Sequence, residues 1–131
     1  MAEQPVRPLS PHLTIWKWGP QMAISILHRA TGIALAVAGG IGFVWWLLAI
    51  SDGKESYLAF RECADAWYGL VIKIGLTWAF FQHLCSGVRH FFLDIGTGYE
   101  LNANKSGTIA AFIMAIILTA ATWGYLWYGK G

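Results

Sequence analysis

Two ionisable residues, His28 and Arg29, lie near the start of a long apolar stretch, in the segment Ser-Ile-Leu-His-Arg-Ala-Thr-Gly at 25–32. An arginine at membrane depth is energetically costly, so its presence there indicates a functional site. At 3.6 residues per turn, Ser25, His28 and Arg29 fall within about 100° of one another around a helix. The sequence therefore predicts a hydroxyl, an imidazole and a guanidinium on one helical face near a membrane surface.

A second polar group lies in Phe-Phe-Gln-His-Leu-Cys-Ser-Gly-Val-Arg-His at 80–90. On a helix, Gly87 and His90 lie within about 40° of His83, and a flat macrocycle has room to approach the backbone at Gly87. A b-type haem needs an imidazole at the iron, space for the porphyrin edge, and cationic or hydrogen-bonding groups at its propionates. The spacing favours haem binding, although a histidine bonded to a neighbouring helix is an alternative explanation of His83.

The elements that must position these residues are three apolar stretches, at 23–50, 66–93 and 108–128. Each is long enough to cross a bilayer, which takes about 20 residues. Hydrophobic residues make up 56% of the chain and charged residues 12%, about half the charged share of a soluble domain. The sequence thus predicts one all-α domain over 1–131, an integral membrane bundle of three transmembrane helices.

The remaining segments are expected to connect or flank the spans. Ser-Asp-Gly at 51–53 is typical of a helix stop before a short polar connection, and the glycines and asparagines of 96–107 indicate a loop. Residues 1–20 contain four prolines and no apolar core, so they are expected to form an interfacial N-terminal arm. The first span also has a stripe of small residues that is expected to permit close helix packing, made of Gly32, Ala36, Gly39 and Gly40 with Gly42 beyond.

The net charge of +2 is too small and too scattered to indicate nucleic-acid binding. The placement of the charges instead indicates how the chain is oriented in the membrane. Lys and Arg are in slight excess on the N-terminal side, which favours a cytoplasmic N-terminus and an outer C-terminus. The first span then runs outward from His28 and the second runs inward to His90. The two polar groups are therefore expected to meet at the cytoplasmic surface.

The depth of the histidines predicts how many haem ligands this chain supplies. His83 lies about 10 Å deeper than His90 along its helix, and His28 is expected at the inner end of the first span. Neither is then expected to face His83 across an iron. The third stretch contains no histidine, and Met114 is its one possible ligand at a matching site. We expect His83 to be the single axial ligand and another polypeptide to supply the second.

Three segments together carry a resemblance to a known family: Arg-Pro-Leu-Ser-Pro-His-Leu-Thr-Ile-Trp at 7–16, the segment at 25–32, and His-Leu-Cys-Ser-Gly-Val-Arg-His-Phe-Phe-Leu-Asp at 83–94. The chain resembles the cytochrome b556 family of membrane anchors of succinate dehydrogenase, respiratory complex II. The resemblance covers nearly the whole chain. The family commonly has tyrosine where Trp16 stands, which leaves an aromatic ring but no phenolic hydroxyl.

The resemblance implies that Ser25 and Arg29 are catalytic residues of a quinone-reduction pocket that Trp18 lines, with ubiquinone favoured over menaquinone. Reduction of a quinone takes two electrons and two protons, and negative charge develops on oxygen. Preorganised donors stabilise such charge. A serine hydroxyl can donate one hydrogen bond, and an arginine stabilises negative charge without changing its own protonation.

The resemblance also implies haem b, with His83 as an axial ligand of the iron and His28, Arg29 and His90 near the propionates. The implied partners are a second small membrane anchor, an iron–sulfur subunit and a flavoprotein that oxidises succinate to fumarate. The implied location is a bacterial inner membrane, favoured over the mitochondrial inner membrane.

Two other classes of function remain open at this point. One is a non-redox membrane scaffold or transporter component that uses Arg29 and His83 as intramembrane polar contacts. The other is an independent cytochrome that ligates haem through two of its own histidines. A visible absorption spectrum separates the first class from the haem proteins, and the ratio of haem to polypeptide separates the second from a shared site.

Overall fold

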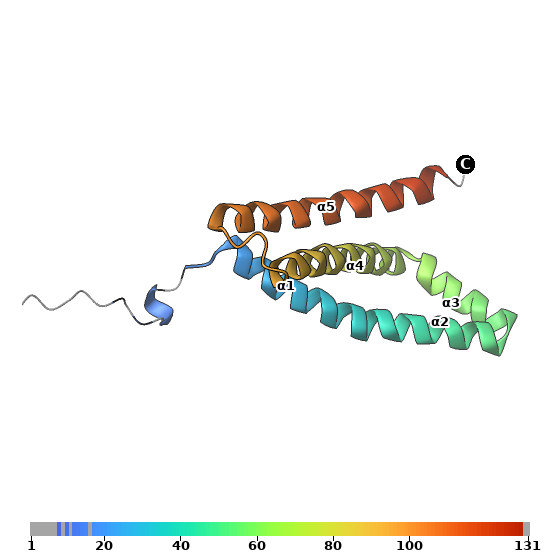
Figure 1. Ribbon diagram of the computed structural model, residues 1–131. Helices are drawn as coiled ribbons and strands as arrows, with labels where there is room; N and C mark the ends of the chain where they lie inside the picture. Colours follow the sequence, from blue (N-terminus) through green and yellow to red (C-terminus); the bar gives the residue numbers. More distant parts are fainter. Residues whose placement is uncertain (1–7, 9, 11, 16, 130–131) are drawn as a thin grey trace, which may run out of the picture.

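The computed structural model describes residues 8, 10, 12–15 and 17–129 (Figure 1). All regular structure in these residues is helical, which confirms the all-α prediction. The elements are the 3-10 helix η1 (Leu13–Ile15), α1 (Pro20–Ala34), the π-helical segment η2 (Leu35–Gly39), α2 (Gly40–Asp52), α3 (Lys54–Asp65), α4 (Trp67–Asp94) and α5 (Leu101–Tyr128).

The helices form three long rods that lie side by side. As Figure 1 shows, α1, η2 and α2 make one continuous rod, α3 turns the chain back, and α4 and α5 then run antiparallel to each other. Helix α4 is central, because it packs against both α1 and α5. The start of α1, the end of α4 and the start of α5 therefore lie at the same end of the bundle.

Two of the rods, Pro20–Asp52 and Leu101–Tyr128, combine sufficient length with mean hydropathies of 2.2 and 2.0 to cross a membrane. Helix α4 has 28 residues, like α5, but polar side chains lower its hydropathy. Two of these, Gln82 and Ser86, are fully buried and joined by a 2.9 Å hydrogen bond. The amide nitrogen of Gln82 is thus paired inside the bundle, whereas its Oε1 is buried without a hydrogen-bond partner among the described residues.

The segments between the rods differ in part from the sequence prediction. Gly53, with φ 112°, separates α2 from α3, as the helix-stop pattern predicted. The loop predicted over 96–107 is wrong in its second half, because α5 already begins at Leu101. Asn104 accepts a hydrogen bond from Arg89 of α4, so an asparagine that suggested a loop instead ties the first turns of α5 to the bundle.

Small residues do bring helices together, but mainly at positions other than the predicted ones. Ala79 of α4 and Ala111 and Ala115 of α5 are buried and allow these two rods to approach closely. A methyl group at Gly39 or Gly40 would meet no described atom within 4 Å. The packing role expected for those two glycines is therefore wrong for contacts within this chain.

The predicted N-terminal arm falls largely outside the described residues. In its described part, η1 is exposed, with 90% of Leu13 accessible. The prediction that this arm lies along the membrane or against a partner stays a prediction.

Candidate functional site

Three histidines from two helices form a row at one end of the bundle. The rings of His28 and His83 stack with centroids 4.0 Å apart and an interplanar angle of 5°. The centroids of His28 and His90 are 5.1 Å apart, with an interplanar angle of 32°. Helix α1 thus inserts the His28 ring between two imidazoles of α4, so the two polar motifs of the sequence meet as predicted.

The expectation that depth separates His28 from His83 is wrong. Helix α1 begins at Pro20, so His28 is eight residues inside it, or about 12 Å along its axis. His90 and His83 lie four and eleven residues before the end of α4 at Asp94, or about 6 and 16 Å. His28 therefore lies between them in depth. Its ring also faces Gly87, where an added Cβ would be 3.8 Å from His28 Cε1, and so takes the space expected for a macrocycle.

Hydrogen bonds fix the orientation of the α4 histidines. His83 Nδ1 donates to the carbonyl oxygen of His28 at 3.0 Å and lies 3.5 Å from Thr31 Oγ1. His90 Nδ1 donates to the carbonyl oxygen of Ser86 at 2.7 Å. A histidine whose Nδ1–H is held by a carbonyl presents a lone pair at Nε2, the arrangement that a metal ligand needs. His83 Nε2 has no hydrogen-bond partner among the described residues. It is also not one of the polar atoms that are buried without a partner. This nitrogen is therefore accessible from outside the chain.

Gly32 makes the position of His83 possible. A Cβ atom at Gly32 would lie 2.8 Å from His83 Cε1 and 3.3 Å from Nδ1. No side chain fits there without displacing the imidazole. Gly32 was predicted to permit helix packing in general, although its place four residues after His28 on the same face was a signal for a specific role.

The His83 side chain fits a b-type haem as a ligand of its iron. His83 offers an accessible ring nitrogen with its opposite nitrogen hydrogen-bonded, and Gly32 leaves room for the imidazole ring itself. His28 Nδ1 is buried without a hydrogen-bond partner among the described residues, which is uncommon for a polar atom in a folded protein. His28 and His83 stack face to face, so their nitrogens do not converge on one atom between the rings. The stacked pair would therefore present a single ring nitrogen, His83 Nε2, to an iron atom.

The three residues assigned to a quinone pocket lie at the same end but do not enclose a pocket by themselves. Ser25 is half-buried and Arg29 is exposed, both on α1, and 72% of Trp18 is accessible on the segment before α1. Thr31 and other threonines of the helices donate to the preceding turn. Ser25 and Arg29, by contrast, show no hydrogen bond or ion pair to any described residue. Their donors are available to a ligand, while Trp16 lies outside the described residues.

The opposite end of the bundle has a different electrostatic character. Asp65, at the end of α3, accepts from Lys73 Nζ at 3.1 Å and from Arg61 Nε at 3.3 Å. These hydrogen bonds hold the pKa of the Asp65 carboxyl below its ordinary value of 3.8, and the bond from Lys73 contributes more than the bond from Arg61. The two cations thus share one carboxylate where α3 meets α4.

A bundle of long apolar rods with polar side chains gathered at one end is typical of a helical membrane protein. Residues 3–122 match the family described as succinate dehydrogenase/fumarate reductase transmembrane subunit, and the chain belongs to this family. It is therefore a membrane-anchor subunit of succinate dehydrogenase, an oxidoreductase. This result rejects the alternative of a non-redox scaffold or transporter component.

Relatives from bacteria and mitochondria are similar over most of the chain. A succinate dehydrogenase cytochrome b556 subunit of Rickettsia felis is 41% identical over 120 residues, which cover 89% of this chain and 90% of the relative. That of Paracoccus denitrificans is 34% identical over 116 residues, 88% of each chain. The mitochondrial cytochrome b560 subunit of Mus musculus is 36% identical over 114 residues, 85% of this chain and 66% of the relative.

Proposed function

We propose that this chain holds haem b together with a second membrane anchor and forms part of the quinone-reduction site of succinate:quinone oxidoreductase. The observation that carries the proposal is the His83 imidazole. Its Nδ1 is bonded to the His28 carbonyl, and its Nε2 is accessible from outside the chain.

In the proposed haem site, His83 is the axial ligand from this chain, and His28, Arg29 and His90 lie near the propionates. Haem b, when bound, supplies a one-electron redox centre. The carbonyl of His28 makes His83 a better donor by holding its Nδ1–H. Because His28 is stacked on His83 rather than opposed to it, the second ligand comes from the other anchor, which argues against an independent cytochrome.

In the proposed quinone site, Ser25 donates a hydrogen bond to a quinone carbonyl oxygen, and Arg29 stabilises the negative charge that develops there. Trp18, exposed just before α1, lines the pocket, and a partner chain supplies the remaining wall. The proposed substrate is ubiquinone in preference to menaquinone. The absence of any partner for Ser25 and Arg29 among the described residues supports this role.

We propose that the chain crosses the membrane three times, with its N-terminus in the cytoplasm, in a bacterial inner membrane rather than a mitochondrial one. Helix α4 has the same length as α5 and packs between the two rods that meet the hydropathy criterion. A helix in that position must cross with its neighbours. The orientation follows from the excess of basic residues on the N-terminal side.

The proposed partners are the second anchor, an iron–sulfur subunit and a flavoprotein. The helices occupy nearly all of residues 20–128, so oxidation of the water-soluble succinate belongs to other chains. In this proposal the iron–sulfur subunit delivers electrons to the quinone that Ser25 and Arg29 hold at the cytoplasmic surface.

The test uses the assembled complex with Ser25→Ala or Arg29→Leu, and Ser106→Ala as a matched control. Ser106 is an exposed serine of α5 at the same end of the bundle. Loss of one donor to a developing oxyanion typically costs roughly a hundredfold in rate. We expect that loss in succinate-to-ubiquinone activity with either α1 variant, with unchanged succinate oxidation by a soluble artificial acceptor and no effect of Ser106→Ala. Equal loss of both activities in assembled complex would refute the assignment.

A further inference from the structure

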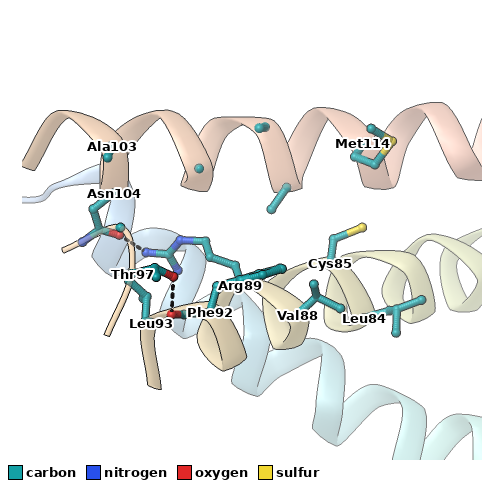
Figure 2. Close-up of a pocket in the computed structure, with 14 residues that line it drawn as sticks. Leu84, Cys85, Val88, Arg89, Phe92, Leu93, Thr97, Ala103, Asn104 and Met114 are labelled. Carbon is teal, nitrogen blue, oxygen red and sulfur yellow. Dashed lines mark hydrogen bonds between the residues drawn. The ribbon is translucent and has the colours of Figure 1, made fainter. Parts of the chain in front are cut away.

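A cavity between α4 and α5 lies apart from the histidine row. It has a volume of about 490 Å³, and Figure 2 shows its lining, which includes Cys85 and Val88 of α4 and Met114 of α5. At 100° per residue, Arg89 lies about 120° around α4 from His83. The cavity therefore opens on a different face of α4 from the proposed haem site.

Arg89 gives this otherwise apolar cavity one strongly polar end. Its guanidinium donates to Asn104 Oδ1 across the gap between α4 and α5 (Figure 2). Its Nε atom is buried without a hydrogen-bond partner among the described residues. The ion pairs of the described residues involve Arg61 and Lys73, and none involves Arg89. A neutral amide accepts one hydrogen bond but leaves the positive charge uncompensated.

Arg89 is half-buried, so its guanidinium is partly removed from water and an anion would compensate its charge. Removing a guanidinium from water is costly unless a counter-charge and further hydrogen bonds offset the desolvation. A quinone is neutral and does not supply that charge. A phosphate does, and its oxygens match the donors of a guanidinium.

The depth of Arg89 in the membrane indicates which kind of molecule carries the phosphate. Helix α4 has 28 residues, or about 42 Å, close to the full thickness of a bilayer with its headgroups. Arg89 lies five residues before the end of α4, or about 7.5 Å inward, near the boundary between headgroups and hydrocarbon. The phosphate of a phospholipid lies at this boundary, and its acyl chain would extend toward Met114 along the apolar lining.

We propose that the α4–α5 cavity binds a phospholipid with a net negative headgroup, whose phosphate pairs with Arg89 and whose acyl chain fills the apolar part. This inference rests on the proposed crossing of the membrane by α4. It is independent of Ser25, Arg29 and the haem ligand, so its failure is distinguishable from theirs.

The experiment measures lipid retained by the purified complex after exchange into nanodiscs of phosphatidylcholine with an equal amount of phosphatidylglycerol. Native mass spectrometry counts the bound lipids. One basic residue near the membrane surface contributes on the order of 1 kcal/mol of attraction, so the wild-type complex should retain phosphatidylglycerol about fivefold over phosphatidylcholine at one site. Arg89→Gln should abolish this preference, and Lys105→Gln, which removes an exposed charge at the same end, should preserve it.

Two further variants keep the test decisive if Arg89→Gln does not assemble. Ala110→Phe retains the guanidinium but fills the cavity, and should lower lipid retention. A photoreactive phenylalanine analogue in place of Met114 should form a lipid adduct in the assembled complex. Equal retention of both lipids by the wild-type complex, unchanged preference in Arg89→Gln, an adduct with a partner polypeptide, or a quinone in the cavity would each overturn the proposal.

Discussion

A methyl group added at Gly32 should weaken haem binding without weakening the helix. The new Cβ would lie 2.8 Å from His83 Cε1, whereas carbon atoms in contact are about 3.5–4.0 Å apart. The imidazole must therefore move by about 0.7–1.2 Å. Its bond to the His28 carbonyl, now 3.0 Å, would be lost or badly bent by such a shift. Loss of the hydrogen bond that orients a ligand typically lowers metal affinity by about 10- to 100-fold.

The same substitution is expected to stabilise the helix itself, so a loss of haem would not be explained by unfolding of α1. Alanine is more favourable than glycine inside a helix by about 0.5–1 kcal/mol, so Gly32→Ala should not destabilise α1 locally. Gly40→Ala is the matched control, because a methyl group there meets no described atom within 4 Å.

The assay is the ratio of haem to protein in the purified complex, together with its reduced-minus-oxidised spectrum. We expect a lowered haem content or an altered low-spin spectrum in Gly32→Ala, and wild-type values in Gly40→Ala. A Gly32→Ala complex with full haem content and an unchanged spectrum would show that the position of the His83 ring does not matter. It would refute the reasoning from the close approach.

Three further predictions follow from the site, the topology and the charge cluster. His83→Leu should remove the six-coordinate low-spin spectrum, and an unchanged spectrum would exclude His83 as the ligand. A reporter fused after Gly131 should be exposed outside the cytoplasm, whereas cytoplasmic activity would invert the proposed orientation. The pKa of Asp65 is lower in the folded protein than its ordinary value of 3.8. Pairing with Lys73 and Arg61 therefore stabilises the fold at pH values above 3.8. This stabilisation is lost as the pH falls through the lowered pKa of the folded protein. Asp65→Asn should therefore lower the thermal stability of the complex slightly at pH 7, and the difference from wild type should shrink on acidification below about pH 4; a difference independent of pH would contradict this.

Much of the fold was predictable because apolar length dominates it. The three predicted stretches correspond to the three rods. The predicted and observed ends differ by at most three residues, except that α5 begins seven residues earlier than predicted. The first turns of α5 were missed because their glycine and asparagine content resembles a loop. In the structure a hydrogen bond from Arg89 to Asn104, 15 positions apart in the chain, joins these turns to α4.

The arrangement of the candidate residues was not predictable from the sequence. Ser25, His28, His83 and His90 were selected from spacing within each helix, and their role in a site stays a prediction. The stacking of His28 on His83 was missed because it depends on where α1 begins relative to the end of α4. A start at Pro20, before the apolar run, moves His28 deeper than the hydropathy pattern indicated.

The most direct test is purification of this chain from its native membrane in mild detergent, with identification of the co-purifying chains and a reduced-minus-oxidised spectrum. We expect a second small anchor, an iron–sulfur subunit and a flavoprotein to co-purify, with one haem b per pair of anchors. Recovery of this chain alone with stoichiometric low-spin haem would contradict the shared site, and a complex without haem b would contradict the role of His83.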